Sequence, residues 1–175
     1  MKLKTALKKR ATTLAIWAIV AVLAAVAVTW LPHAGTETPP EVEFVLLDGR
    51  KISLSVLRGR PVLVSFWATS CPPCIEELPD LIRLYRDLHP QSLELIAVAA
   101  PYDPPTRVQS FAAGRALPYP VALDLDGKAA QAFGGVPYIP AAFIIDRDGA
   151  ITYSQTGKLD ITRARRIILK SLSQK

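Results

Sequence analysis

The chain has 175 residues, of which 50% are hydrophobic and 21% charged, and its formal net charge is +6. This composition excludes the disordered class, and the length leaves room for one domain of ordinary size. Five of the 21 basic residues lie within residues 1–10, which contain no acidic residue, so the other 16 stand against all 15 acidic residues. Because nucleic-acid binding requires clustered basic side chains on a folded surface, this nearly neutral remainder excludes that function.

The basic residues 1–10 are followed by residues 11–31, which carry no charge. As a helix rising about 1.5 Å per residue, this segment would span roughly 31 Å, close to the thickness of a membrane's hydrocarbon core. A cleaved signal peptide is the alternative, but its apolar region is usually shorter, about 7–15 residues. We therefore predict a transmembrane anchor whose basic flank stays in the cytoplasm of a bacterial cell, which places the remaining chain in the periplasm or outside the cell.

The chain after the anchor divides into a proline-rich linker, residues 32–41, and a folded domain, residues 42–175. Apolar runs predict strands at residues 44–47, 51–54, 61–67, 93–99, 121–123, 141–146 and 151–155. Helical spacing predicts helices at residues 75–88, 108–116 (after a proline-rich loop at 101–105), 128–133 and 161–172, the last capped by Asp160. This alternation predicts an α/β fold: a central mixed sheet with helices on both faces and an N-terminal hairpin extension, preceded by one transmembrane helix.

The two cysteines of the chain, Cys71 and Cys74, lie where a predicted strand gives way to a helix. Both thiols then fall near the positive end of the helix dipole, where a thiolate is stabilised. Pro72 and Pro73 fit a first helical turn, because its backbone N–H groups have no partner within the helix. We expect Cys71 to be the more exposed sulfur and to attack a disulfide, after which Cys74 resolves the mixed disulfide.

Three other interpretations of the cysteine pair compete with redox chemistry. A structural disulfide is one, but a bridge between residues three apart closes a very small loop and stabilises weakly. A zinc site is another, but it needs two more ligands, and the only histidines are His33, in the linker, and His89. The third is a pair of buried, inert thiols, which the position at a helix start disfavours.

Two sequence motifs accompany the cysteine pair, one around it and one further along the chain. Residues 62–79 hold Trp67 four residues before the first cysteine and Pro79 five residues after the second, and residues 136–146 hold a proline loop followed by an apolar strand. Together they resemble the thioredoxin superfamily, and within it the TlpA/ResA-like branch of membrane-anchored, extracytoplasmic disulfide reductases. The resemblance covers residues 42–172. It implies a thioredoxin-like fold with a redox-active Cys71–Cys74 disulfide.

The same resemblance implies roles for Pro140 and Glu77. Pro140 would follow a cis peptide bond, in a loop that faces the cysteines and offers backbone hydrogen bonds to an extended substrate. The alternative is an ordinary trans turn proline, since only about 5–6% of X-Pro bonds are cis in folded proteins. Glu77 matches an acid that ResA-like proteins associate with substrate selection and thiol protonation. The alternative is an exposed first-turn acid that favours the helix dipole, as Glu76 would.

Three positions depart from the pattern of the family. Ser70 replaces the tryptophan that usually precedes the first cysteine, which removes an aromatic side chain from the expected docking surface. Ser65 replaces a buried aspartate that serves proton transfer, and Glu77 is the candidate to take over that task. Ala141 replaces the threonine that often follows the cis-proline.

The sequence therefore indicates a thiol:disulfide oxidoreductase that needs neither a cofactor nor a bound metal. The resemblance implies a monomer that takes electrons from a membrane thiol carrier and reduces disulfides in partner apoproteins, in cytochrome c maturation or metal-site assembly. Two alternatives stay open. One is a disulfide-forming oxidase, since thioredoxin-like potentials span roughly −270 to −120 mV. The other is a Cu(I) delivery protein, since thiolates select that soft ion.

Overall fold

A seven-stranded sheet with the strand order β2-β1-β5-β4-β3-β6-β7 forms the centre of the fold. The computed structural model describes residues 41–173. The strands are β1 (Glu43–Leu46), β2 (Lys51–Ser53), β3 (Val62–Trp67), β4 (Glu94–Ala99), β5 (Val121–Leu123), β6 (Ala141–Ile145) and β7 (Ile151–Thr156). β3, β4 and β5 run parallel, whereas the β1–β2, β1–β5, β3–β6 and β6–β7 pairs are antiparallel. This mixed sheet confirms the predicted α/β class.

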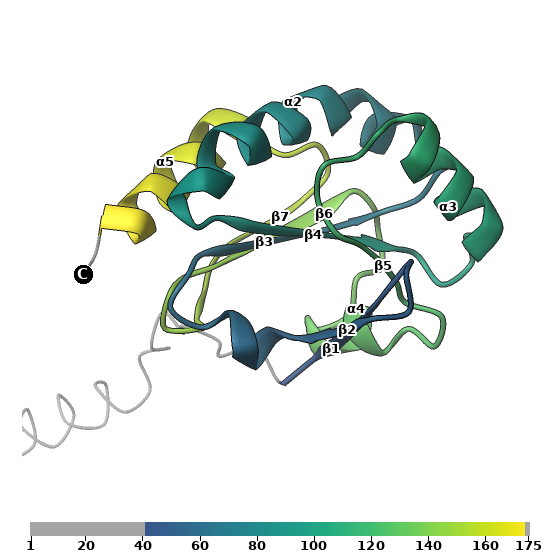
Figure 1. Ribbon diagram of the computed structural model, residues 1–175, viewed down its shortest axis with the longest axis horizontal. Coiled ribbons are helices and arrows are strands. Elements are labelled where there is room, and N and C mark those ends of the chain that lie inside the picture. The colour runs from purple at the N-terminus through teal and green to yellow at the C-terminus, as the bar shows by residue number, and fades with distance from the viewer. Residues whose placement is uncertain (1–40, 174–175) are drawn as a thin grey trace, which may run out of the picture. The chain divides into compact units, whose positions relative to one another are not determined.

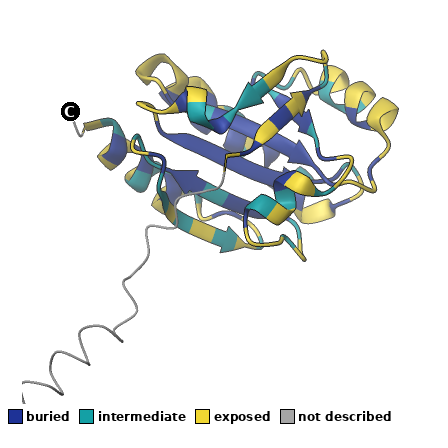
Figure 2. Cartoon of the chain, turned by 90° about the horizontal axis from the view of Figure 1, so that it is seen from below, coloured by how far each residue is buried: buried dark blue, intermediate teal, exposed yellow. Residues whose placement is uncertain are grey.

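Helices cover the sheet on both faces, as predicted. The helices α2 (Pro72–Leu88), α3 (Pro105–Gly114) and α5 (Ile161–Ser173) lie on one face, and α4 (Lys128–Ala132) lies on the other (Figure 1). Side chains of β3 alternate between the two faces, so Leu63 joins the apolar cluster under α2 and α5, whereas Val64 joins the cluster at α4. All six residues of β3 are buried. Figure 2 shows the buried strands enclosed by helices whose outer sides are exposed.

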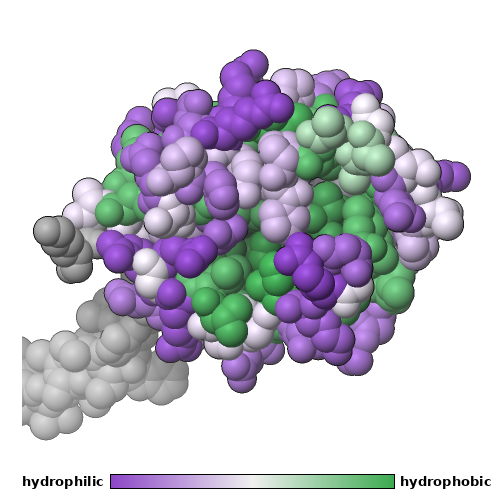
Figure 3. Space-filling model, in the orientation of Figure 1, coloured by the Kyte–Doolittle hydropathy of each residue, from purple (hydrophilic) through white to green (hydrophobic). Residues whose placement is uncertain are grey.

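The N-terminal hairpin extension is also confirmed. β1 and β2 pair through a turn in which Gly49 adopts a φ of +83°, a left-handed conformation that glycine reaches without strain. β1 then pairs with β5, which extends the sheet at that side. Val45 in β1 is 37% exposed, so hydrophobic side chains are not fully buried in this hairpin. In the same orientation as Figure 1, the surface of the domain shows hydrophobic areas between hydrophilic side chains (Figure 3).

Predicted and observed element bounds differ by up to three residues, and two of the differences have a clear local cause. Leu54, predicted to end a strand, instead begins a short 3₁₀ helix (Leu54–Leu57), because the side chain of Ser53 caps it by accepting the N–H of Ser55. The helix expected at residues 108–116 is α3, which begins at Pro105. Proline suits the first helical position, and the apolar pattern used for the prediction starts one turn later, at Val108. A second short 3₁₀ helix (His89–Gln91) follows α2.

The predicted cap of the last helix is confirmed. The carboxylate of Asp160 accepts the backbone N–H of Arg163 at 2.9 Å. The buried residues of α5 are Ala164, Ile168 and Ser171. The helix therefore packs through the face that the spacing of its apolar residues predicted.

The predicted anchor and linker, residues 11–31 and 32–41, lie outside the described residues except for Glu41. Between residues 41 and 173, none of the helices combines the length and the hydrophobicity that a membrane crossing requires. The anchor stays a prediction.

Candidate active site

The start of α2 positions the two cysteines. Cys71 has an extended backbone (φ −99°, ψ 102°) and is the N-cap of the helix, and Pro72 and Pro73 occupy its first two positions. The carbonyl of Cys71 accepts the N–H of Ile75 at 3.1 Å, which is the first bond of the helical ladder. Since neither proline has an N–H to leave unpaired, the helix can begin directly after the first cysteine. This places Cys74 in the first turn, as the sequence predicted.

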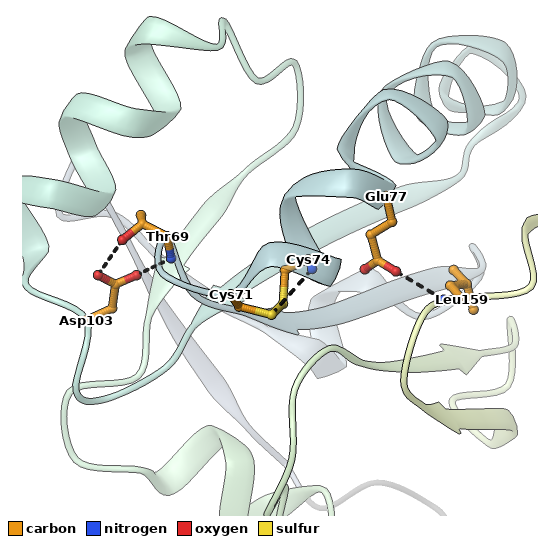
Figure 4. Close-up of a disulfide and its surroundings, with 6 residues drawn as sticks. All are labelled: Thr69, Cys71, Cys74, Glu77, Asp103 and Leu159. Atoms are coloured by element: carbon orange, nitrogen blue, oxygen red, sulfur yellow. Dashed lines mark hydrogen bonds between the residues drawn. A yellow bond between two sulfur atoms is a disulfide. The ribbon is translucent and has the colours of Figure 1, made fainter.

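Cys71 and Cys74 are joined by a disulfide with an S–S distance of 2.07 Å and a Cα–Cα distance of 5.3 Å. The backbone N–H of Cys74 donates to the Sγ of Cys71 at 3.3 Å (Figure 4). Cys71 is 9% exposed and Cys74 only 1%, so an incoming sulfur reaches Cys71 first. The helix dipole and this N–H both stabilise negative charge on Cys71.

Glu77 lies one turn beyond Cys74, on the other side of the disulfide from Thr69 in Figure 4. Its side chain is 1% exposed, and one carboxylate oxygen accepts the backbone N–H of Leu159 at 3.0 Å. Burial raises the pKa of Glu77, and the bond from Leu159 and the charge of Lys158 oppose that increase. The alternative of an exposed first-turn acid is therefore wrong for Glu77, which is buried. Glu76 is exposed, but because α2 begins at Pro72 neither glutamate lies in the first turn.

The burial of Glu77 has a signal in the sequence. Residues 77, 81, 84 and 88 follow a 4-3-4 spacing, and the last three are leucines whose side chains are at most 2% exposed. Glu77 therefore shares the apolar face of α2, and the helical phase alone separates it from Glu76.

Trp67 and Pro140 lie at the sheet edge from which the cysteine loop starts. Trp67 is the last residue of β3 and is 2% exposed, and its ring packs against Phe111 with centroids 5.4 Å apart. The Ile139–Pro140 peptide bond is cis, as the resemblance implies. The register of β6 against β3 pairs Ala141 with Phe66, so Pro140 lies opposite the end of β3.

Asp103 belongs to the site although no sequence pattern singles it out. Its side chain is 2% exposed, and its carboxylate accepts the backbone N–H of Thr69 at 2.6 Å and the hydroxyl of Thr69 at 2.8 Å (Figure 4). These bonds join the loop after β4 to the loop that precedes Cys71. An aspartate in a proline-rich loop is typical of an exposed turn, and its partner lies 34 residues away, so local pattern contains no signal for this contact.

Comparison with known proteins agrees with this geometry. The sequence profile of the AhpC/TSA family matches residues 35–154. The chain is 36% identical over 129 residues to the thiol-disulfide oxidoreductase ResA of Halalkalibacterium halodurans, covering 73% of this chain and 70% of that protein. It is 34% identical over 126 residues to ResA of Bacillus thuringiensis subsp. konkukian, covering 71% and 70%. The chain belongs to the AhpC/TSA family of thioredoxin-like proteins.

A solved structure supports the same assignment. A thiol:disulfide interchange protein of the thioredoxin family from Chlorobium tepidum superposes with a TM-score of 0.70 at 26% identity, covering 78% of this chain and 96% of that one. Together with the ResA relatives and the disulfide at the start of α2, this makes the chain a thiol:disulfide oxidoreductase.

The three departures of this thioredoxin-like oxidoreductase from its family have different environments. Ser65 is 2% exposed in the middle of β3, and Ala141 is 2% exposed at the start of β6, so both are core positions. Ser70 is exposed directly before Cys71. The loss of an aromatic side chain at Ser70 therefore changes the surface that a partner meets.

Within residues 41–173, no three His, Cys, Asp or Glu side chains gather closely enough to hold an ion. Both sulfur atoms of this thioredoxin-like domain are engaged in the disulfide.

Proposed function

We propose that this oxidoreductase is a reductant of protein disulfides. The unequal exposure of the two sulfurs at the start of α2, 9% for Cys71 and 1% for Cys74, carries the assignment of Cys71 as the attacking sulfur, and the reducing direction rests on the resemblance to the reductase branch. The thiolate of Cys71 attacks one sulfur of a client disulfide, the client S–S bond breaks, and the other client sulfur leaves as a thiolate that takes up a proton. The thiolate of Cys74 then attacks Cys71. The client's second sulfur leaves reduced, and two electrons have passed from the cysteine pair to the client.

Glu77 is suited to supply or accept a proton during the second step. Its carboxyl group is enclosed by the fold, and burial raises its pKa, so the group is neutral at a higher pH than an exposed glutamate. Cys74 must lose its proton before it can attack Cys71. Glu77 lies one helical turn from Cys74, and Ser65 occupies the position where the resemblance expects a buried aspartate. We assign the proton exchange to Glu77 on these grounds.

In this proposal, the loop that ends at Pro140 holds the client segment beside the cysteines. The loop before β6 ends in the cis Ile139–Pro140 bond opposite the end of β3. Among the hydrogen bonds between described residues, the N–H and carbonyl of Ile139 take part in none. An extended client segment can pair with these groups in the manner of an added strand.

The cellular setting of the proposal rests on the N-terminal sequence and on the resemblance to the TlpA/ResA-like branch. The chain is a single-pass protein of the bacterial cytoplasmic membrane with its redox domain outside the cytoplasm. There it acts as a monomer and takes electrons from a membrane thiol carrier. Its clients are apoproteins whose cysteines must be reduced before they bind haem or a metal ion, as in cytochrome c maturation.

Trapping of the mixed disulfide tests the mechanism. In Cys74→Ala, the resolving thiol is absent, so Cys71 should stay bound to client proteins in membranes of the native host, and a reductant should release them for mass spectrometry. Cys71→Ala is the matched control and should trap far less protein. If Cys74→Ala traps no more than Cys71→Ala, the attack by Cys71 is wrong.

The reduction potential separates a reductant from an oxidase. We expect a value nearer the reducing limit of about −270 mV than the oxidising limit of about −120 mV known for this fold. A potential near the oxidising limit would favour the disulfide-forming alternative.

A further inference from the structure

Three short segments meet at the edge of the sheet where the disulfide lies. Residues 69–73 and 101–105 follow the parallel strands β3 and β4, and residues 136–140 precede β6, which runs antiparallel to β3. Because the carboxyl ends of parallel strands and the start of an antiparallel neighbour share one edge, the three segments lie next to one another at the edge that holds Cys71. We refer to them together as the rim.

The rim is rich in proline and has no exposed charge. It holds seven of the 15 prolines of the chain. Its single charged residue is Asp103, which is buried and bonded to Thr69. Since proline fixes φ, these loops lose little conformational entropy when a partner binds, so the rim presents an ordered and uncharged surface.

Two tyrosines extend from the rim into solvent. Tyr102 is 65% exposed and Tyr138 is 73% exposed, which makes Tyr138 the most exposed large hydrophobic side chain of the described residues. Neither ring takes part in a hydrogen bond or a ring contact found between residues 41 and 173. Tyrosine is over-represented among the side chains that dominate binding energy, because it buries a large apolar area and keeps a polar end.

The loops that carry the two tyrosines are held close to the cysteine loop. Tyr102 directly precedes Asp103, whose carboxylate holds the backbone N–H of Thr69 at 2.6 Å. Tyr102 therefore lies beside the loop that contains Ser70, the exposed residue before Cys71. Tyr138 lies two residues before Pro140, which lies opposite the end of β3. The two tyrosines thus lie on two loops that neighbour the loop of the nucleophile, and the position directly before Cys71 carries only a serine.

We propose that Tyr102 and Tyr138 dock the client protein by binding uncharged, apolar residues on either side of its disulfide. The inference rests on the proposed function and names the class of segment that the site accepts. Because Cys71 is only 9% exposed, a client must lie against the rim to bring its sulfur within reach. A charged segment placed there would lose water without gaining a partner, which is costly, whereas apolar residues gain contact with tyrosine and proline.

The test compares two peptides with one small disulfide. Each peptide contains one internal disulfide, flanked by leucine and phenylalanine in the first and by aspartate and lysine in the second, and hydroxyethyl disulfide is the small probe. The reduced full-length protein should prefer the apolar peptide. Tyr102→Ala and Tyr138→Ala should each lower the second-order rate constant for reduction of that peptide by about fivefold to thirtyfold, the loss expected when an important interface side chain just short of a hot spot is truncated. The rate with hydroxyethyl disulfide and the reduction potential should not change.

Matched variants isolate the docking effect. Tyr102→Phe keeps the ring and should keep most of the preference. Val56→Ala removes another exposed hydrophobic side chain, 69% exposed in the 3₁₀ helix before β3, and should change neither peptide rate. Thermal unfolding of each variant should match that of the parent protein, since the substituted side chains are exposed.

The outcomes separate this inference from the proposed function. If the parent protein reduces all three probes but treats the peptides alike, or if the tyrosine variants lose activity equally on all three, docking through Tyr102 and Tyr138 is wrong and the reductase function stands. If the parent protein reduces none of the probes, the reductase function fails and the docking proposal fails with it. If either tyrosine variant converts a dimer into a monomer, the surface is an interface between copies of this chain, which also overturns the proposal.

Discussion

The buried carboxyl group of Glu77 connects protonation with stability. The folded state raises its pKa above the ordinary value of 4.5, chiefly through burial, while the Leu159 N–H and the charge of Lys158 oppose the increase and the charge of Asp80 adds to it. A raised pKa means that the folded state binds a proton more tightly than the unfolded state. The stabilisation is therefore complete below the unfolded pKa and is lost as the pH rises through the folded pKa.

Glu77→Gln should remove this pH dependence. Glutamine has no proton to lose and can still accept the Leu159 N–H through its amide oxygen. The melting temperature of the variant, relative to that of the parent protein, should therefore rise between about pH 4 and about pH 8. Thermal unfolding across that range measures the difference. Glu76→Gln, at the exposed neighbouring position, is the control, and a difference for Glu77→Gln that does not change with pH would contradict the account.

Asp103 acts on the cysteine loop through Thr69. Asp103→Ala removes both acceptors and leaves the Thr69 N–H without a partner, which should lower the free energy of unfolding by about 1–3 kcal/mol. The amide hydrogens of the loop before Cys71 should also exchange faster with solvent. Thr69→Val, which loses only the hydroxyl bond, should cost less, about 0.5–1.5 kcal/mol. Denaturant unfolding and hydrogen exchange test the pair, and equal costs for both variants would argue against the backbone contact.

At the scale of elements, a buried carboxylate determines the position of the short helix α4. Asp124 is 4% exposed and accepts the backbone N–H groups of Ala129 at 2.8 Å and Ala130 at 2.9 Å. Asp124→Ala should lower the free energy of unfolding by about 2–3 kcal/mol, because two hydrogen bonds to a charged group are lost in a buried position. Asp126→Ala is the matched control. Asp126 is exposed and, among residues 41–173, pairs with Lys128, so its loss should leave the free energy of unfolding nearly unchanged.

Elements with a strong local pattern could be predicted from the sequence, and contacts between distant loops could not. The continuous apolar run of β3 and the helical spacing of α5 decide those elements, because burial on one or both faces requires that pattern. α3 was misplaced by three residues at its start because its first turn is exposed and carries no apolar signal. The functions of Asp103 and Asp124 depend on which backbone groups the folded chain brings near, and residue type alone does not contain that information.

The features of the candidate active site also divide into those that could be predicted from the sequence and those that could not. The cysteine pair and its helix start follow from spacing, and the cis bond at Pro140 followed from the resemblance. The burial of Glu77 could have been predicted from the phase of α2. The role of the exposed tyrosines of the rim, by contrast, could not be predicted from the sequence, because it depends on the topology that brings three separate loops to one edge of the sheet.

At the scale of the whole chain, the positions of the basic residues and the cysteines permit a direct test of membrane topology. Five of the six net positive charges lie in residues 1–10, and the only two cysteines, Cys71 and Cys74, lie in the redox domain. Every thiol-specific label on the reduced protein therefore reports the location of that domain. If residues 11–31 cross the membrane with the basic flank in the cytoplasm, both thiols face outward.

A membrane-impermeant maleimide should accordingly label the protein in intact spheroplasts after mild reduction, to the same extent as after lysis. The protein should also remain with the membrane after an alkaline carbonate wash, because a spanning apolar helix resists extraction that removes surface-bound proteins. The double variant Cys71→Ala and Cys74→Ala should show no labelling, which controls for other nucleophiles. Labelling that appears only after lysis would place the domain in the cytoplasm, where disulfide exchange meets a reducing thiol pool and the proposed client class has no need of a dedicated reductant.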